Sequence, residues 1–217
     1  MIRKIAPALL ALAIAAEVQA APRYLAVTDS IHTQAYGSTR PSKMSFNLVN
    51  NNITGIVDVL GSPGLTTAPQ GGYAGAVDLL PAIEIWKGRF GARWVFLLTG
   101  TNDHGLSVPL ETYKTSLRTL AAGIDSMGLE MLCVKPLWKS TQNVRNDYGL
   151  VLADYSRAME SVCDEFGFVT LTFAANSTDF VDGIHLNETG HARFAEWFTN
   201  VGVFFGAWSK LSTTFRK

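Results

Sequence analysis

The sequence has few cysteines and histidines, and they lie far apart. Its 217 residues include two cysteines, Cys133 and Cys163, and four histidines. This set does not match the ligand spacing of a zinc site, so we expect no bound metal. Cys133 lies in a strand-like run and Cys163 in a helix-like one, and their spacing does not decide whether they pair. Two separately buried thiols are at least as well supported as a disulfide.

The sequence also lacks an excess of charge. Its 18 basic and 18 acidic side chains cancel, and no cluster of lysine or arginine occurs. Because a protein that binds nucleic acid needs a positive field to meet the phosphate backbone, nucleic-acid binding is not expected. Internal repeats and low-complexity tracts are absent as well, which favours an ordinary globular domain.

No apolar run is long enough to cross a bilayer. The run at 5–16 follows Arg3 and Lys4 and ends just before the small-residue pattern Val-Gln-Ala. It is shorter than the roughly 20 residues that a spanning helix requires, and the pattern is typical of a cleavable signal peptide. We therefore expect residues 1–20 to be removed before Ala21 and the protein to be secreted or periplasmic. An uncleaved N-terminal anchor is the alternative.

Removal of that leader leaves 197 residues, a length that one α/β domain fills. We expect a single domain over residues 21–208, followed by a flexible C-terminal tail at 209–217. The sequence does not indicate an oligomeric state.

Short strand-like apolar runs alternate with segments of helical periodicity. The strand-like runs are 24–27, 56–60, 94–98, 130–134 and 168–171. The helical segments are about 72–87, 110–127, 148–166 and 188–203. This alternation predicts a parallel sheet of five strands with helices on both faces, a three-layer α/β/α sandwich. Strands with no polar alternation fit the interior of such a sheet because both of their faces are covered.

Polar residues and glycines follow the first three strand-like runs. Ser30 comes after the first run, Gly64 after the second and Asn102 after the third. Open parallel sheets bind ligands beyond the carboxyl ends of their strands, and a strand order of 2-1-3-4-5 would place the first strand between the second and the third. The three residues would then lie together at one edge of the sheet. Gly61 competes with Gly64 for this place, and the Gly-x-x-Gly-x-Thr pattern favours Gly64.

Asp182 and His185 supply what a nucleophilic serine needs. A serine hydroxyl reacts poorly at neutral pH without a base, and that base needs an acid that fixes its tautomer. A spacing of three residues in a turn lets the Asp182 carboxylate meet one imidazole nitrogen of His185 while the other nitrogen faces Ser30. The N–H groups of Ser30 and Gly64 and the Asn102 amide are suited to binding the negative oxygen of a tetrahedral intermediate. The sequence therefore predicts a catalytic triad and an oxyanion hole.

These segments resemble the sequence blocks of the SGNH (GDSL-like) hydrolase family. Asp-Ser-Ile at 29–31 resembles its Gly-Asp-Ser block, and Gly64 resembles its second-block glycine. Gly-Thr-Asn-Asp at 100–103 and Asp-Gly-Ile-His at 182–185 resemble the asparagine block and the terminal Asp-x-x-His block. The resemblance spans about residues 25–198. Thr28 departs from the family, which usually has glycine there, but this change removes no catalytic atom.

The resemblance implies a flavodoxin-like fold with strand order 2-1-3-4-5, no cofactor, and activity as an esterase, lipase, thioesterase or carbohydrate deacetylase. We expect ester hydrolysis through an acyl-enzyme, with a small molecule or a polysaccharide as the substrate. No long insertion supplies a lid, which favours short acyl groups over lipid esters and thioesters. The alternatives are a non-catalytic binding module on the same fold and an O-acyltransferase.

Further residues are placed to contact a substrate. We expect such contacts from Asp29 and His32, which flank Ser30, and from Trp138, which follows the fourth strand. His104 and His191 are expected at the surface or behind the reacting groups, because only His185 has a carboxylate at the right spacing. Taken alone, Ser30 would be read as a helix cap and Asp182 as part of a turn. Their joint order favours the catalytic interpretation.

Overall fold

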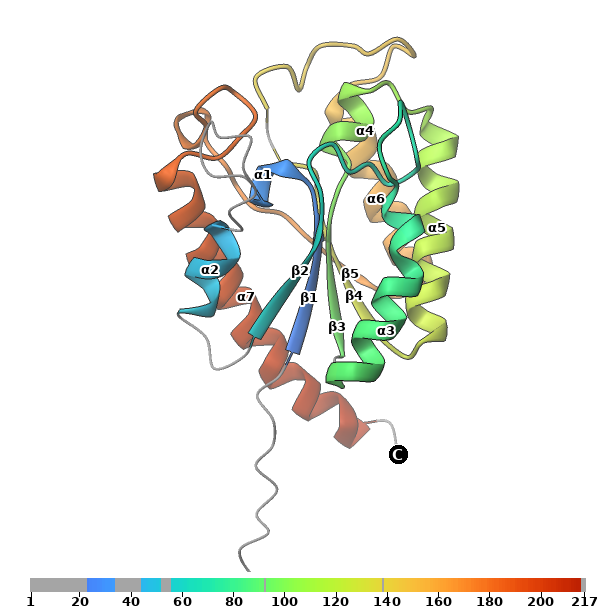
Figure 1. The fold of residues 1–217 in the computed structure, drawn as a ribbon, viewed down its shortest axis with the longest axis vertical. Coiled ribbons are helices and arrows are strands. Elements are labelled where there is room, and N and C mark those ends of the chain that lie inside the picture. Colours follow the sequence, from blue (N-terminus) through green and yellow to red (C-terminus); the bar gives the residue numbers. More distant parts are fainter. Residues whose placement is uncertain (1–22, 34–43, 52–55, 92, 138, 216–217) are drawn as a thin grey trace, which may run out of the picture.

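The protein is built around a parallel sheet, which we describe from a computed structural model. The structure describes residues 23–33, 44–51, 56–91, 93–137 and 139–215. The strands are β1 (Arg23–Thr28), β2 (Ile56–Gly61), β3 (Trp94–Leu98), β4 (Glu130–Val134) and β5 (Val169–Leu171). All neighbouring strands pair in parallel, in the order β2-β1-β3-β4-β5 (Figure 1). The predicted fold class and strand order are therefore confirmed.

Helices cover both faces of the sheet (Figure 1). They are α1 (Ser30–Thr33), α2 (Met44–Asn50), the 3₁₀ turn η2 (Ala76–Leu79), α3 (Leu80–Phe90), α4 (Thr101–Gly105), α5 (Leu110–Ser126), α6 (Leu152–Glu165), the 3₁₀ turn η3 (Ser177–Asp179) and α7 (Glu188–Phe215). One face carries α3, α5 and α6, and the other carries α1, α2 and α7. Within the described ranges, no helix combines the length and the apolar character that crossing a bilayer requires.

The strands pack apolar side chains into a separate core on each face. In β1, Leu25 and Val27 join the core beneath α3, α5 and α6, while Tyr24 and Ala26 join the core beneath α2 and α7. All five residues of β3 are buried in the same alternating way. Successive side chains of a strand point to opposite faces, so a strand covered on both sides must be apolar throughout. This explains the continuous hydrophobic runs of the sequence.

A disulfide joins β4 to α6 in this structure. Cys133 and Cys163 are bonded, with their Cα atoms 6.7 Å apart, and neither residue is exposed to solvent. This answers the question of pairing that the sequence left open. Because 30 residues separate the two cysteines, the bond removes much of the freedom that this segment would have in the unfolded chain.

Several element boundaries differ from those expected from the sequence. The helical segment expected from 72 begins only with η2, because Gly71 and Gly72 both have positive φ and form a turn. The segment expected from 148 becomes helical only at α6, because the Asn146 side chain accepts backbone N–H groups two and four residues later and holds a turn. Helix α7 continues through 209–215, where we expected the start of a tail. The leader at 1–20 lies outside the described residues.

The disulfide predicts a measurable loss of stability when it is removed. We expect Cys163→Ala to lower the free energy of unfolding by about 2–4 kcal/mol, because the unfolded chain regains the freedom of a 30-residue loop. Urea denaturation of the wild type and the variant measures this difference. Adding Cys133→Ala to Cys163→Ala should change stability little further, since the bond is already lost. A single variant as stable as the wild type would contradict this prediction.

Candidate active site

The ends of three strands bring the predicted site residues to one edge of the sheet. Thr28, near the end of β1, pairs with Gly61 of β2 on one side and with Leu98 of β3 on the other. The three strands therefore end at the same level. The helices α1 and α4 begin at this edge, and the connection from β2 to α3 starts there too (Figure 1). Ser30 opens α1 and Asn102 lies in the first turn of α4.

Ser30, His185 and Asp182 form a continuous chain of polar contacts. The Nε2 atom of His185 lies 3.1 Å from the Oγ atom of Ser30, across 155 residues of sequence. The Nδ1 atom of His185 lies 2.7 Å from the Oδ2 atom of Asp182. Ser30 is largely buried, with 8 % of its surface exposed, whereas the side chain of His185 is 24% exposed. The structure thus brings together the three residues predicted as a triad.

The turn that carries Asp182 and His185 is shaped by its own hydrogen bonds. The Oδ1 atom of Asp182 accepts the backbone N–H groups of Ile184 (3.0 Å) and His185 (2.8 Å). Gly183 has a φ of +82°, and a side chain there would collide with the hydroxyl of Ser140. The carbonyl of Gly183 in turn accepts the N–H of Ser140 at 2.8 Å. The segment after β4 therefore holds this turn in place.

The pKa of Asp182 reflects this arrangement. Partial burial, the largest single influence, would raise it, but the hydrogen bonds from the backbone and ring of His185 and from the Ile184 N–H together lower it below the usual value. The carboxylate therefore stays ionised at neutral pH and is available to an imidazolium.

Asn102 connects the loops that follow β1 and β2. Its Nδ2 atom donates to the carbonyl of Leu65 at 3.0 Å and to the Oδ2 atom of Asp29 at 3.3 Å. Gly64, the residue before Leu65, has a φ of +77°, a backbone conformation that favours glycine. Gly61 lies inside β2 instead, where an added Cβ would lie 1.9 Å from the Thr28 carbonyl oxygen. Gly61 thus allows close strand pairing, and Gly64 is the glycine of the loop.

Asp103 is an anchor that the sequence did not reveal. Its carboxyl is fully buried, and its two oxygens lie 2.9 and 3.0 Å from the backbone nitrogen of Thr67, whose N–H donates to them. The Thr67 hydroxyl lies 2.8 Å from that of Thr99. Burial raises the pKa of Asp103 to about 7, although the hydrogen bonds from Thr67 lower it. Asp103 thus fixes the connection between β2 and α3 against the start of α4.

Two residues expected to contact a substrate are buried. Asp29 is 1 % exposed, and its Oδ1 atom accepts the N–H of Ile31 at 2.9 Å. Burial raises its pKa to about 7, against the lowering effects of the Ile31 N–H and the nearby charges of His185 and Lys139. In this structure the side chain of Asp29 contacts Asn102, and its contact with a substrate stays a prediction.

His32 is the second of these buried residues. It is 1 % exposed, with its ring 4.1 Å from that of Phe194 and close to Phe46. Burial lowers its pKa well below the usual value, with His191 lowering it further, so the ring is neutral. His32 therefore packs within the core on the α7 side, and its contact with a substrate stays a prediction. Trp138, the third expected contact, lies outside the described residues.

Two further histidines and a lysine are buried and hydrogen-bonded to neighbouring segments. His104 and His191 are both buried; His104 Nε2 lies 3.0 Å from the Val144 carbonyl, and His191 Nδ1 lies 2.7 Å from the Ser45 hydroxyl. Lys139 is buried as well and donates to the carbonyl of Thr101 at 3.3 Å. Burial lowers the pKa of Lys139, although the charge of Asp29 opposes this shift. This role of Lys139 has no signal in the sequence, because its hydrogen-bond partner Thr101 lies 38 residues away along the chain.

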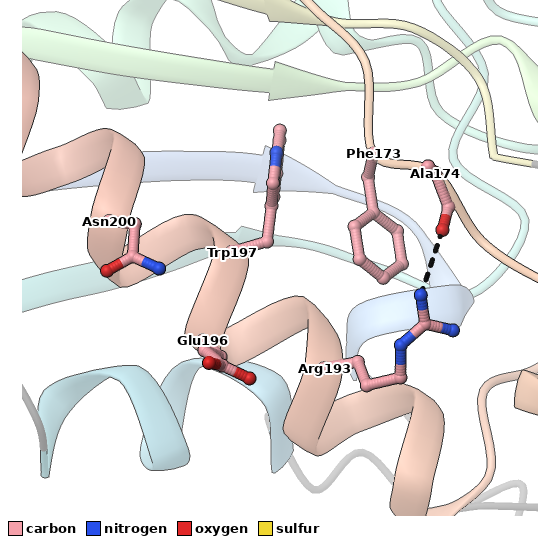
Figure 2. Close-up of a pocket in the computed structure, with 6 residues that line it drawn as sticks. All are labelled: Phe173, Ala174, Arg193, Glu196, Trp197 and Asn200. Atoms are coloured by element: carbon pink, nitrogen blue, oxygen red, sulfur yellow. Dashed lines mark hydrogen bonds between the residues drawn. The ribbon is translucent and has the colours of Figure 1, made fainter.

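A surface pocket lies elsewhere, between α7 and the segment after β5 (Figure 2). It is lined by Phe173, Ala174, Arg193, Glu196, Trp197 and Asn200, none of which is a predicted site residue. The guanidinium of Arg193 donates to the Ala174 carbonyl and pairs with Asp179. In the described part of the chain, no group of three or more His, Cys, Asp or Glu side chains is arranged to hold a metal ion.

Comparisons with known proteins find a matching family model and solved structures of similar fold. Residues 28–193 match the family model of the GDSL-like lipase/acylhydrolase family. A lipase/acylhydrolase from Enterococcus faecalis is similar in structure, with a TM-score of 0.67, 18% identity and coverage of 82% of this chain and 94% of that one. The carbohydrate acetylesterase Est24 from Sinorhizobium meliloti gives a TM-score of 0.64 at 15% identity, covering 85% of this chain and 99% of its own. No curated protein matches the chain.

The raised pKa of Asp103 predicts a pH-dependent difference between the wild type and Asp103→Asn. The folded state holds this proton up to about pH 7, whereas the unfolded chain releases it near the ordinary pKa of 3.8. Between these values the folded state binds more protons, so the contribution of Asp103 to stability is full below about pH 4 and is lost as the pH rises through about 7.

We therefore expect the unfolding free energy of the wild type, minus that of Asp103→Asn, to fall as the pH rises from about 4.5 to about 7.5, by at most about 1.4 kcal/mol per pH unit. Urea denaturation of both proteins at the two pH values measures the change. A difference that stays constant, or that grows with pH, would argue against this burial effect.

Proposed function

The chain belongs to the GDSL-like lipase/acylhydrolase family, and we propose from this that it hydrolyses carboxylic esters through an acyl-enzyme formed on Ser30. The observation that carries the proposal is the contact chain from the Ser30 hydroxyl through both nitrogens of His185 to Asp182. A serine, an imidazole and a carboxylate in this order form the minimal set for nucleophilic acyl transfer.

In this mechanism Ser30 Oγ attacks the ester carbonyl carbon while His185 Nε2 takes its proton. The Nδ1–H of His185 donates to Asp182 Oδ2, and the carboxylate stabilises the imidazolium that forms. The imidazolium then gives its proton to the leaving alkoxide, the C–O bond breaks, and the alcohol departs. In the second half, His185 takes a proton from water, the hydroxide oxygen attacks the acyl carbon, and Ser30 Oγ leaves with the proton returned by His185.

The oxyanion of each tetrahedral intermediate is held by the N–H groups of Ser30 and Gly64 and by the Asn102 amide. In the described part of the chain, the N–H of Gly64 donates to no protein acceptor. The Asn102 amide donates to Leu65 at 3.0 Å and to Asp29 at the longer distance of 3.3 Å. The weaker of these bonds is the one that the amide gives up when it meets the oxyanion. Donors fixed in advance in this way lower the barrier most effectively.

Esters of short acyl groups, including acetyl groups on carbohydrates, are the substrate class that we propose. Ser30 and His185 lie at an edge where the side chain of His185 is 24% exposed, which suits a substrate that approaches from solvent. The fold shared with a carbohydrate acetylesterase supports this choice.

We also propose that the protein acts outside the cytoplasm, in the periplasm or after secretion. The leader pattern at 1–20 is one support. The disulfide between Cys133 and Cys163 is a second, independent support, because such bonds persist mainly in oxidising compartments.

Ser30→Ala tests the nucleophile directly. We expect hydrolysis of p-nitrophenyl acetate to fall by about 10⁴-fold or more, and labelling by a fluorophosphonate to disappear, because among the described residues Ser30 supplies the hydroxyl that His185 contacts. Ser126→Ala is the matched control, since that exposed hydroxyl only caps α5 through the Gly123 carbonyl. Equal rates in the wild type and Ser30→Ala would sink the proposal.

Asn102→Ala tests the oxyanion donor. Loss of one such donor lowers kcat by about 10²- to 10³-fold with little change in KM, because the donor acts mainly on the transition state. Steady-state kinetics on p-nitrophenyl acetate provide the values, with the exposed Asn200→Ala on α7 as the control. A change confined to KM would mean that Asn102 binds the substrate without stabilising the intermediate.

A further inference from the structure

The aromatic ring of Tyr73 lies directly against Gly64. A methyl group built on the Cα atom of Gly64 would lie 2.2 and 2.3 Å from the Cδ1 and Cε1 atoms of this ring. Atoms that close overlap, so the ring occupies the space where any larger residue at 64 would place its side chain. The ring is therefore an immediate neighbour of the residue whose N–H we assign to the oxyanion hole.

The backbone of Tyr73 is held by a tight hairpin. Tyr73 donates its N–H to the carbonyl of Gln70 at 2.9 Å and accepts the N–H of Gln70 at 3.3 Å. The two residues between them, Gly71 and Gly72, have φ values of +58° and +83°, the pattern of the turns that close two-residue hairpins. The carbonyl of Ala74, the next residue, accepts the N–H of Thr66 at 3.3 Å, which joins the hairpin to the segment that follows Gly64. The ring is thus presented from a fixed support.

The ring nevertheless remains open to solvent. Tyr73 is 46 % exposed, whereas Tyr113 and Tyr155 in the core are fully buried. Much of its apolar surface therefore has no protein contact, although its backbone is well fixed. A half-exposed ring on a rigid support, beside a proposed oxyanion donor, is available to pack against part of a bound ester.

The geometry of the intermediate indicates which part of the ester that is. The carbonyl carbon carries four groups: Ser30 Oγ, the oxyanion, the leaving oxygen and the acyl chain. The oxyanion points to Gly64 and Asn102, and the leaving oxygen must face His185, which protonates it. The acyl chain is the remaining group, and it leaves the reacting carbon on the side away from His185. We propose that Tyr73 is a specificity-determining residue, whose ring forms a wall along which the acyl chain packs.

This inference rests on the proposed function and adds a substrate preference to it. Each methylene that packs on the ring is withdrawn from water and favours the bound state. Acetyl groups end too soon to gain this contact, whereas butyryl and hexanoyl chains extend over the ring. Tyr73 thus sets how well the enzyme accepts acyl chains longer than acetyl.

The test compares kcat/KM for p-nitrophenyl acetate, butyrate and hexanoate in the wild type, Tyr73→Ala and Tyr73→Phe. In Tyr73→Ala we expect about a tenfold fall for hexanoate, corresponding to about two methylenes that lose their contact, and less than about a twofold change for acetate. Tyr73→Phe keeps the ring and should retain the wild-type profile. Phe90→Ala is the control, because Phe90 is a partly exposed aromatic residue beside Arg23 at the opposite end of β1.

A second series keeps the acetyl group and varies the alcohol. Tyr73→Ala should leave the relative rates for these alcohols as they are in the wild type, since the leaving group faces His185. An unchanged acyl-length profile in Tyr73→Ala would show that the ring does not pack against the acyl chain, and so would a change confined to the alcohol series. Either result would leave the proposal of Ser30-dependent hydrolysis intact. Hydrolysis that survives Ser30→Ala would instead overturn the proposed function. Thermal melting of each variant separates loss of fold from loss of selectivity.

Discussion

Everything at the candidate site depends on β1, β2 and β3 ending in register. Parallel pairing forces each strand to reach the same edge before its chain turns away, so residues distant in sequence leave the sheet side by side. Ser30 and Asn102 meet in this way because β1 lies between β2 and β3. His185 arrives from the far end of the chain, in a turn whose shape is set by Asp182. The chemistry is thus a product of topology as much as of residue type.

Buried carboxyl groups stiffen this edge. Asp103 accepts the N–H of Thr67, and Asp29 contacts the amide of Asn102, so the segments after β1 and β2 are both joined to the start of α4. Burying a carboxyl costs free energy, which appears here as raised pKa values at both positions. These contacts hold the Asn102 amide, which we propose as an oxyanion donor, in place before a substrate arrives. Donors that need not move stabilise the transition state of acyl transfer best, and these buried contacts restrict such movement.

Periodicity along the chain predicted the sheet, and the motifs predicted the meeting of Ser30 with His185. The strand order came from the resemblance to the SGNH hydrolase family. The sequence missed contacts that depend on distance in space alone. The pairing of Asp103 with Thr67 and the covering of Gly64 by Tyr73 have no periodic signal. The burial of His32 could not be predicted from its position near Ser30, because it depends on the packing of α1 against the core. The cysteine pair stayed undecided since a strand and a helix approach each other only in the folded chain.

The burial of the cysteine pair sets how the protein meets a reducing agent. Thiol–disulfide exchange requires a thiolate to reach one of the two sulfur atoms, and neither Cys133 of β4 nor Cys163 of α6 has any exposed surface. Attack must therefore wait until α6 separates from the sheet. The speed of reduction then reports the frequency of this local opening rather than the reduction potential of the bond. In its native state the protein keeps this bond as a kinetically protected part of its covalent structure.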